Sequence, residues 1–170
     1  QLVSPFGVGA MSVLVDSSSV ITAGLDHWFP RNNTDLALED FRVNDWRLEA
    51  RLNVHEFRLP PDYRKGSPGD HRNEKLSVPA LRFPCYSFCV YCKRLKKVPL
   101  SFQEIVRCTE PTCVGKRRFG PKMSQVPFVA ICKKGHIDDF PFRDWVHRSK
   151  NAGCNGVLRL FSTGGGGLEG

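Results

Sequence analysis

The sequence predicts an α+β fold, a small mixed domain rich in β-strands that carries a zinc-ribbon-like lobe. Three observations predict it. The 170 residues are 41% hydrophobic, which is enough to bury one core. Short β-branched runs alternate with turn residues. Four cysteines fall into two close pairs, a C-x2-C and a C-x4-C, at the spacing of a zinc ribbon: Cys89, Cys92, Cys108 and Cys113.

The N-terminal segment, residues 1–75, is predicted to consist of a β-hairpin followed by loops. Residues 11–15 and 20–24 are apolar, largely β-branched runs on either side of a serine-rich turn, which is the pattern of a hairpin. Residues 45–53 place large apolar side chains among charges and indicate a short helix or an edge strand. Prolines, glycines and charges then mark a linker, so that residues 76–170 form a second, zinc-binding and basic segment.

Regular elements of this second segment are expected on both sides of a short helix. Residues 126–131 read as a buried strand, and residues 157–161 as a last strand before a run of glycines. A helix is predicted over 140–148, with Asp138 or Asp139 as its N-terminal cap.

The ends of the sequence indicate a fragment of a longer protein. The chain has no initiator Met and no leader with basic and apolar regions, and it stops shortly after four consecutive glycines. Its apolar runs are all shorter than the roughly 18 to 20 residues of a membrane helix. Seven cysteines, an odd number without an export signal, favour metal thiolates in a reducing cytoplasm over secreted disulfides.

The two cysteine pairs predict one structural zinc site. Zinc takes four soft ligands at tetrahedral angles, and a C-x2-C turn brings two thiolates to one metal. Fifteen residues separate Cys92 from Cys108, which leaves room for a small β excursion between the two turns. Four thiolates would leave no position for water, so we expect no catalysis there. Four buried free thiols are the alternative, and Cys85 is expected to be a core thiol outside the ligand set.

Positive charge is concentrated beside these cysteines. Residues 1–75 hold nine basic and eleven acidic side chains, whereas residues 76–170 hold sixteen and six. Basic side chains interleaved with aromatic ones suit nucleic acid, although they would equally offset the negative charge of a tetrathiolate centre. The candidate nucleic-acid or partner-binding residues are Lys93, Arg94, Lys96, Lys97, Lys116, Arg117, Arg118 and Lys122.

A second set of zinc ligands follows, spaced C-x3-H-x10-H-x6-C: Cys132, His136, His147 and Cys154. Each is a competent ligand, and two short gaps and one of helix length are compatible with one site. Alternatively, some of the four are structural polar groups, or Cys154 pairs with cysteines beyond Gly170. Acidic residues near His136 leave open a metal-bound water in a hydrolase.

Several strings of residues resemble the N-terminal part of the DrmB family of the DISARM anti-phage defence system. The most specific is Cys132-Lys-Lys-Gly-His136-Ile-Asp-Asp-Phe-Pro with Trp145-Val-His147 downstream. The others include Phe-Gly-Val-Gly-Ala at 6–10 and Phe-Arg-Leu-Pro-Pro at 57–61. The likeness runs over nearly the whole chain, although members of the family are several times longer.

The resemblance implies a non-enzymatic subunit that partners a superfamily 2 helicase, DrmA, and helps it bind DNA. In keeping with this, the chain has no G-x-x-x-x-G-K-[ST] loop for nucleotide hydrolysis. Two other functions stay open: part of a metal-dependent hydrolase or nuclease, and an assembly scaffold that makes no contact with DNA.

Overall fold

The structure is a computed structural model that describes residues 7–29, 37–63, 69, 72–115, 119–150 and 153–161. The predicted fold class is confirmed: the elements are short, mostly strands, with few helices. The chain forms two compact units. Unit 1 comprises the described residues of 1–10 and 21–80, and unit 2 those of 11–20 and 81–170. No helix in the described ranges is both long and apolar enough to cross a membrane.

The first sheet contains the predicted N-terminal hairpin. Strands β1 (Met11–Val13) and β2 (Ser19–Thr22) are neighbours, and β5 (Ala80–Arg82) pairs with the other edge of β2. The turn between β1 and β2 is closed by the Leu14 amide, which donates to the Ser18 carbonyl over 2.8 Å. The division between the two units falls within β2 and β5.

Unit 1 is built from short helices and two-residue strands. Its elements are α1 (Leu25–Trp28), η1 (Leu38–Phe41), β3 (Arg42–Val43), α2 (Trp46–Leu52) and β4 (Phe57–Arg58). Strands β3 and β4 pair antiparallel. The segment predicted as a helix or edge strand is thus the helix α2. It begins after Asp45, whose Oδ1 accepts a hydrogen bond of 3.0 Å from the Leu48 amide.

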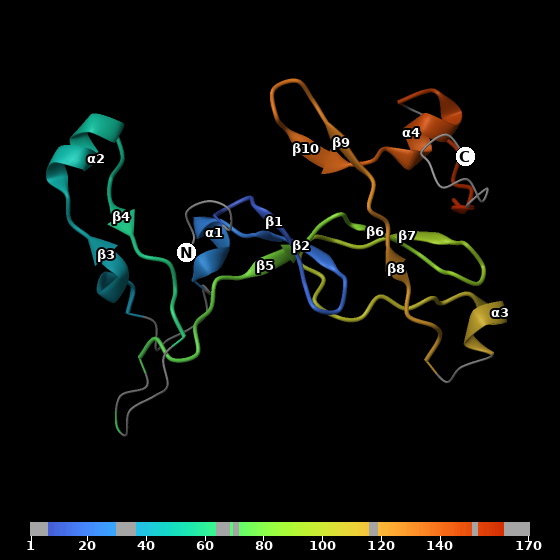
Figure 1. Ribbon diagram of the computed structural model, residues 1–170, viewed down its shortest axis with the longest axis horizontal. Coiled ribbons are helices and arrows are strands. Elements are labelled where there is room, and N and C mark those ends of the chain that lie inside the picture. Colours follow the sequence, from blue (N-terminus) through green and yellow to red (C-terminus); the bar gives the residue numbers. More distant parts are fainter. Residues whose placement is uncertain are drawn as a thin grey trace. The chain divides into compact units, whose positions relative to one another are not determined.

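Unit 2 is organised on a three-stranded antiparallel sheet in the order β7-β6-β8 (Figure 1). Its strands are β6 (Tyr86–Phe88), β7 (Leu95–Lys97) and β8 (Ser124–Gln125). Phe88 lies opposite Leu95 on one side and Ser124 on the other. The sheet therefore places the turn after β6, which carries the first cysteine pair, beside β7.

The expected strand over 126–131 and the expected helix over 140–148 are both shorter in the structure. The strand β9 covers Val129–Ile131 and pairs antiparallel with β10 (Ile137–Asp139). Pro127 has no amide hydrogen, so the regular ladder does not extend back to Val126. The helix α4 spans Phe142–His147.

The predicted cap of α4 is wrong. Its N-cap residue is Pro141, with no side-chain hydrogen bond, because Asp138 and Asp139 both belong to β10. The last expected strand, 157–161, is reduced to an isolated bridge between Arg94 and Arg159. Even so, the Leu95 amide donates to the Leu158 carbonyl over 2.9 Å, which holds this segment along β7.

Two hydrophobic clusters form the core of unit 2. One contains three buried cysteines with Val98, Val106 and Met123. The other surrounds Leu95, Val126 and Phe142 and includes the rings of Tyr86, Phe88 and Phe140. Side chains alternate along a strand, so β6 directs Tyr86 and Phe88 to the aromatic cluster, and Cys89 that follows joins the cysteine cluster. The same hairpin thus contributes to both clusters.

The carboxylate of Asp139 ties β10 to this sheet. Asp139 is buried, and its Oδ1 accepts a hydrogen bond of 2.7 Å from the Cys85 amide just before β6. Its Oδ2 lies 3.1 Å from Nζ of Lys97 at the end of β7. A buried carboxylate is costly unless it accepts hydrogen bonds and is paired with a positive charge, and here the Cys85 amide and Lys97 meet these two needs. Asp139 therefore fixes where the β9–β10 hairpin attaches.

We expect Asp139→Ala to lower the free energy of unfolding by about 2–3 kcal/mol, because it removes charge-assisted hydrogen bonds and strands the buried Cys85 amide. Chemical denaturation measures this value. The matched control is Asp138→Ala, one residue earlier and exposed, which should change stability much less. Equal losses in the two variants would contradict the role given to Asp139.

Candidate metal centre

The first cysteine pair lies in the turn that joins β6 to β7. The Cys89 amide donates to the Arg94 carbonyl over 3.0 Å, and the Lys93 amide donates to the Cys89 carbonyl over 2.8 Å. Lys93 adopts a left-handed conformation with φ of 65°, which lets the chain turn back into β7. This closed turn holds Cys89 and Cys92 on the same side of the loop.

The second pair is held by two different local structures. Cys108 follows the bridge between Arg107 and Lys122, and its amide donates to the Pro121 carbonyl over 3.0 Å. Cys113 lies in the single turn of helix α3 (Pro111–Val114). The four residues between Cys108 and Cys113, more than in most zinc turns, include the start of α3. Pro111 stands at this start, where a backbone amide would have no intrahelical hydrogen-bond partner, so its missing N–H costs the helix nothing.

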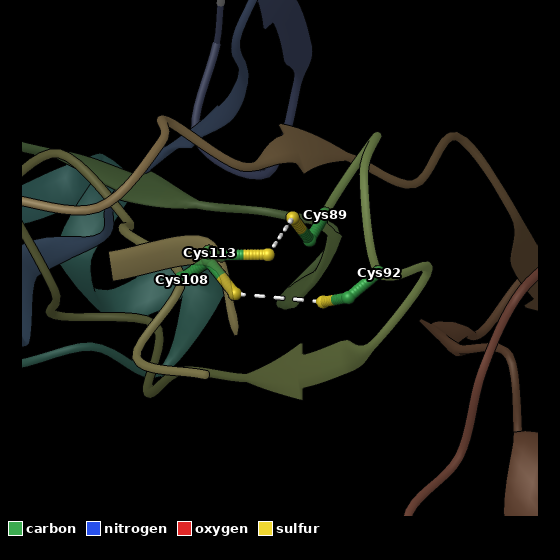
Figure 2. A group of neighbouring side chains, drawn as sticks. All are labelled: Cys89, Cys92, Cys108 and Cys113. Carbon is green, nitrogen blue, oxygen red and sulfur yellow. Dashed lines mark hydrogen bonds between the residues drawn. The ribbon is translucent and has the colours of Figure 1, made fainter. Parts of the chain in front are cut away.

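The four sulfurs converge from these separate elements, as Figure 2 shows. All four ligand atoms lie within 4.8 Å of one another. Sγ of Cys89 is 3.9 Å from that of Cys113, and Sγ of Cys92 is 3.6 Å from that of Cys108. Bonds of about 2.3 Å at tetrahedral angles separate two zinc-bound sulfurs by about 3.8 Å. The donor set therefore fits a single tetrahedral metal ion.

The cluster is enclosed by apolar side chains. Cys89, Cys108 and Cys113 are buried, while Cys92 is half-buried. Val98, Val106 and Met123 pack around them, and Phe102 covers the edge. A metal held here would be shielded from water and would contact protein ligands on every side.

The ionisation of the thiols points to a cation. Burial raises the pKa of Cys89, but hydrogen bonds from the Cys92 and Tyr91 amides overcome this and lower that pKa to about 7. Burial and neighbouring cysteines raise the pKa of Cys108 to about 12, and they raise that of Cys113 as well. One thiolate is thus readily formed, and further thiolates beside it need a positive ion.

Cys85 lies outside this cluster, as expected from the sequence. It is buried, and burial together with the Asp139 carboxylate raises the pKa of its thiol to about 11. Its Sγ lies 3.7 Å from the Arg82 carbonyl oxygen and is not among the four grouped sulfurs. All seven cysteines fall in the described ranges, and none of them forms a disulfide.

Of the second predicted ligand set, the structure brings two residues together. Sγ of Cys132 lies 3.4 Å from Nδ1 of His136. His147 ends α4, and Sγ of Cys154 accepts a hydrogen bond of 3.3 Å from the Gly156 amide. Among the described residues, the four sulfurs above are the one group of three or more potential ligands, so His147 and Cys154 do not join the pair.

Of the five predicted basic contact residues that the structure describes, four are engaged within the chain. Arg94 pairs with Glu110, Lys97 with Asp139 and Lys122 with Asp16. Nζ of Lys93 donates to the Val90 carbonyl over 2.7 Å. Within the described ranges, Lys96 has no such partner. Three further candidates lie outside the described residues: Lys116, Arg117 and Arg118.

Comparison with known proteins places the chain in a family context. A family model described as a domain of unknown function, DUF8724, matches residues 1–170. A DISARM protein DrmB from Bacillus paralicheniformis is 34% identical over 152 residues. The match covers 87% of this chain but 23% of that protein, so the chain spans about a quarter of the relative's length. The resemblance noted in the sequence is thereby confirmed.

Gly120 supports the second cysteine pair, and the sequence reasoning missed it. Its φ is +69°, and an added Cβ would lie 2.2 Å from the carbonyl oxygen of Cys108. The signal was present, because Gly120 and Pro121 form a dipeptide that is typical of turns. Only glycine allows the chain to pass this close to the backbone of a ligand residue.

We expect Gly120→Ala to displace Cys108, lower the metal bound per chain and destabilise unit 2 by more than about 2 kcal/mol through steric and backbone strain. Metal analysis and thermal unfolding measure the two effects. Gly153→Ala is the matched control, because a Cβ there meets nothing within 4 Å. Normal metal content in the Gly120 variant would contradict the expected displacement of Cys108.

Proposed function

Because the chain belongs to the family described as a domain of unknown function, DUF8724, and is similar to a DISARM protein DrmB, we propose a role in anti-phage defence. The chain acts as a non-enzymatic, zinc-binding accessory subunit of the defence complex. It partners a superfamily 2 helicase of the DrmA type and helps that helicase to bind DNA. It works in the reducing environment of the cytoplasm.

The observation that carries this proposal is the closed group of four sulfurs. Four thiol ligands, with sulfur separations of 3.6 and 3.9 Å, match the preference of zinc for a tetrahedral thiolate site. Such a site has no position left for a water or a substrate, and its apolar surroundings keep water out. This favours a structural centre over a metal-dependent hydrolase or nuclease, which needs an open position.

Zinc would join two parts of unit 2 that backbone pairing connects weakly. One cysteine pair belongs to the β6–β7 hairpin, and the other to the segment around α3. The free energy of metal binding in such sites is largely free energy of folding. The metal therefore shapes the lobe that presents the basic residues, and the helicase partner supplies the chemistry.

The contribution to DNA binding rests on the basic surface of that lobe. Lys96 is half-buried in the middle of β7 and, among the described residues, has no ion-pair partner. Arg94, Lys97 and Lys122 would have to exchange a carboxylate for a phosphate. A surface of this kind supports modest, salt-sensitive binding that adds to the binding by a partner. A scaffold without DNA contact is the competing proposal.

We expect Cys89→Ser to abolish the tightly bound zinc and to unfold the lobe around residues 85–125, because it removes a buried ligand. Zinc per chain and thermal unfolding are the measurements. Cys85→Ser is a close control: the same substitution at a buried cysteine four residues away, which lies outside the sulfur group. Full zinc content in Cys89→Ser would refute the ligand assignment.

The DNA contribution is tested by a salt series on duplex DNA with Lys96→Gln. Loss of one phosphate contact should weaken binding and reduce the slope of log affinity against log salt by about 0.9. Lys75→Gln, the same change at an exposed lysine of unit 1, should leave both values unchanged. Wild-type affinity that does not respond to salt would favour the scaffold without DNA contact.

A further inference from the structure

The β9–β10 hairpin is drawn in orange in Figure 1, and the two residues that flank its turn, a cysteine and a histidine, are of types that can ligate metal. Cys132 follows the last residue of β9, and His136 precedes the first residue of β10. Both side chains are exposed, as are the two lysines between them. Sγ of Cys132 and Nδ1 of His136 are 3.4 Å apart. A thiol and an imidazole thus stand together, open to solvent.

The separation of these two atoms matches a pair of zinc ligands. With bonds of about 2.3 Å to sulfur and 2.0–2.1 Å to nitrogen at a tetrahedral angle, the two donors lie about 3.6 Å apart. A hydrogen bond from the thiol to the imidazole would give a similar distance, so the distance does not choose between the two. The turn that aims Cys132 supplies a second, independent observation.

The turn at Cys132 is closed by two backbone hydrogen bonds of the same kind as the turn at Cys89, in a loop that is one residue shorter. The Cys132 amide donates to the His136 carbonyl over 3.0 Å, and the Gly135 amide donates to the Cys132 carbonyl over 2.9 Å. Gly135 has φ of 82°, as Lys93 has a positive φ in the first turn. In both turns a cysteine begins the loop and a left-handed residue ends it. In both turns the chain thus reverses directly after a cysteine; the second potential ligand is Cys92, three residues later, in the first turn and His136, four residues later, in the second.

The other two predicted ligands are held elsewhere. The backbone around Cys154 is fixed by Arg143, which donates to the Cys154 carbonyl and, over 3.1 Å, to the Gly156 carbonyl. Sγ of Cys154 is engaged by the Gly156 amide. His147 is exposed at the end of α4 and is not grouped with the hairpin pair in the described part of the chain. Among the four predicted ligands, the structure therefore brings only Cys132 and His136 together.

We propose that Cys132 and His136 form a half-site that binds zinc at the hairpin tip, with donors from outside the hairpin completing the coordination. Those donors are waters in the single chain, or the same two residues of a second copy, which would give two sulfurs and two nitrogens. The zinc ion is then bound reversibly at the protein surface and is not part of the core.

The full chain, stripped of metal under reducing conditions, is titrated with cobalt(II) and followed by absorption. The first equivalent fills the four-cysteine site. A second, weaker event is expected, of one equivalent where water completes the site and of half an equivalent where two chains share the ion. Its thiolate-to-cobalt absorption per metal should be about a quarter of the first in the water case and about half in the shared case, because one or two sulfurs replace four. Cys132→Ser and His136→Ala should each remove the second event and leave the first intact.

His147→Ala and Cys154→Ser are the matched controls, and both should retain the second metal. Loss of the second metal in either control would overturn the half-site and favour the four-residue set. A single binding event in the wild type, unchanged by Cys132→Ser, would also overturn it and leave a thiol–imidazole hydrogen bond.

Sedimentation with zinc identifies the completing donors. A doubled mass with about 1.5 zinc per chain means that the hairpins of two chains share one ion, in addition to the one ion in each four-cysteine site. Two cysteines and two histidines then complete the four ligands of the shared ion. An unchanged mass with two zinc per chain means that water completes it. Either result supports the half-site.

Discussion

The convergence of four cysteine thiols on one point is the constraint on which unit 2 depends. The β6–β7 turn supplies two of them, and the segment around α3 supplies the other two. These segments have little regular pairing with each other, and the buried residues between them are few. A domain of this size with strands of two to four residues gains modest stability from its ladders. A metal-centred cross-link is an effective way to fix such a lobe.

Individual polar side chains add hydrogen bonds to backbone groups next to the short strands. Gln125 in β8 binds the backbone of Ser19 through both amide atoms: it accepts from the Ser19 amide over 2.6 Å and donates to the Ser19 carbonyl over 3.1 Å. It also donates to the Pro84 carbonyl. Asp139 does the same for the Cys85 amide. Each imitates a strand partner, so that the segment 11–20 is joined to unit 2 although it is distant in sequence.

The sequence predicted those features that depend on neighbouring residues. The ligand set of the first site follows from two short spacings, and helix α2 follows from Asp45 and the residues after it. Features that depend on distant partners were missed. Asp139 was expected to cap a helix because the sequence does not reveal that the Cys85 amide needs an acceptor. Likewise, His136 lies beside Cys132 because only one turn separates them. Cys154 is held by Arg143, and the spacing of the ligands along the sequence does not predict this contact.

The low pKa of Cys89 has a consequence for the metal-free chain. The lowered pKa favours the thiolate of Cys89, the form that oxidants attack, and the sulfur of Cys113 lies 3.9 Å away. Oxidation would join these two sulfurs, and the other two are equally close to each other. A disulfide is no longer a thiolate ligand, so the oxidised lobe would not take up metal until it is reduced. A bound ion would therefore protect its own ligands from oxidation.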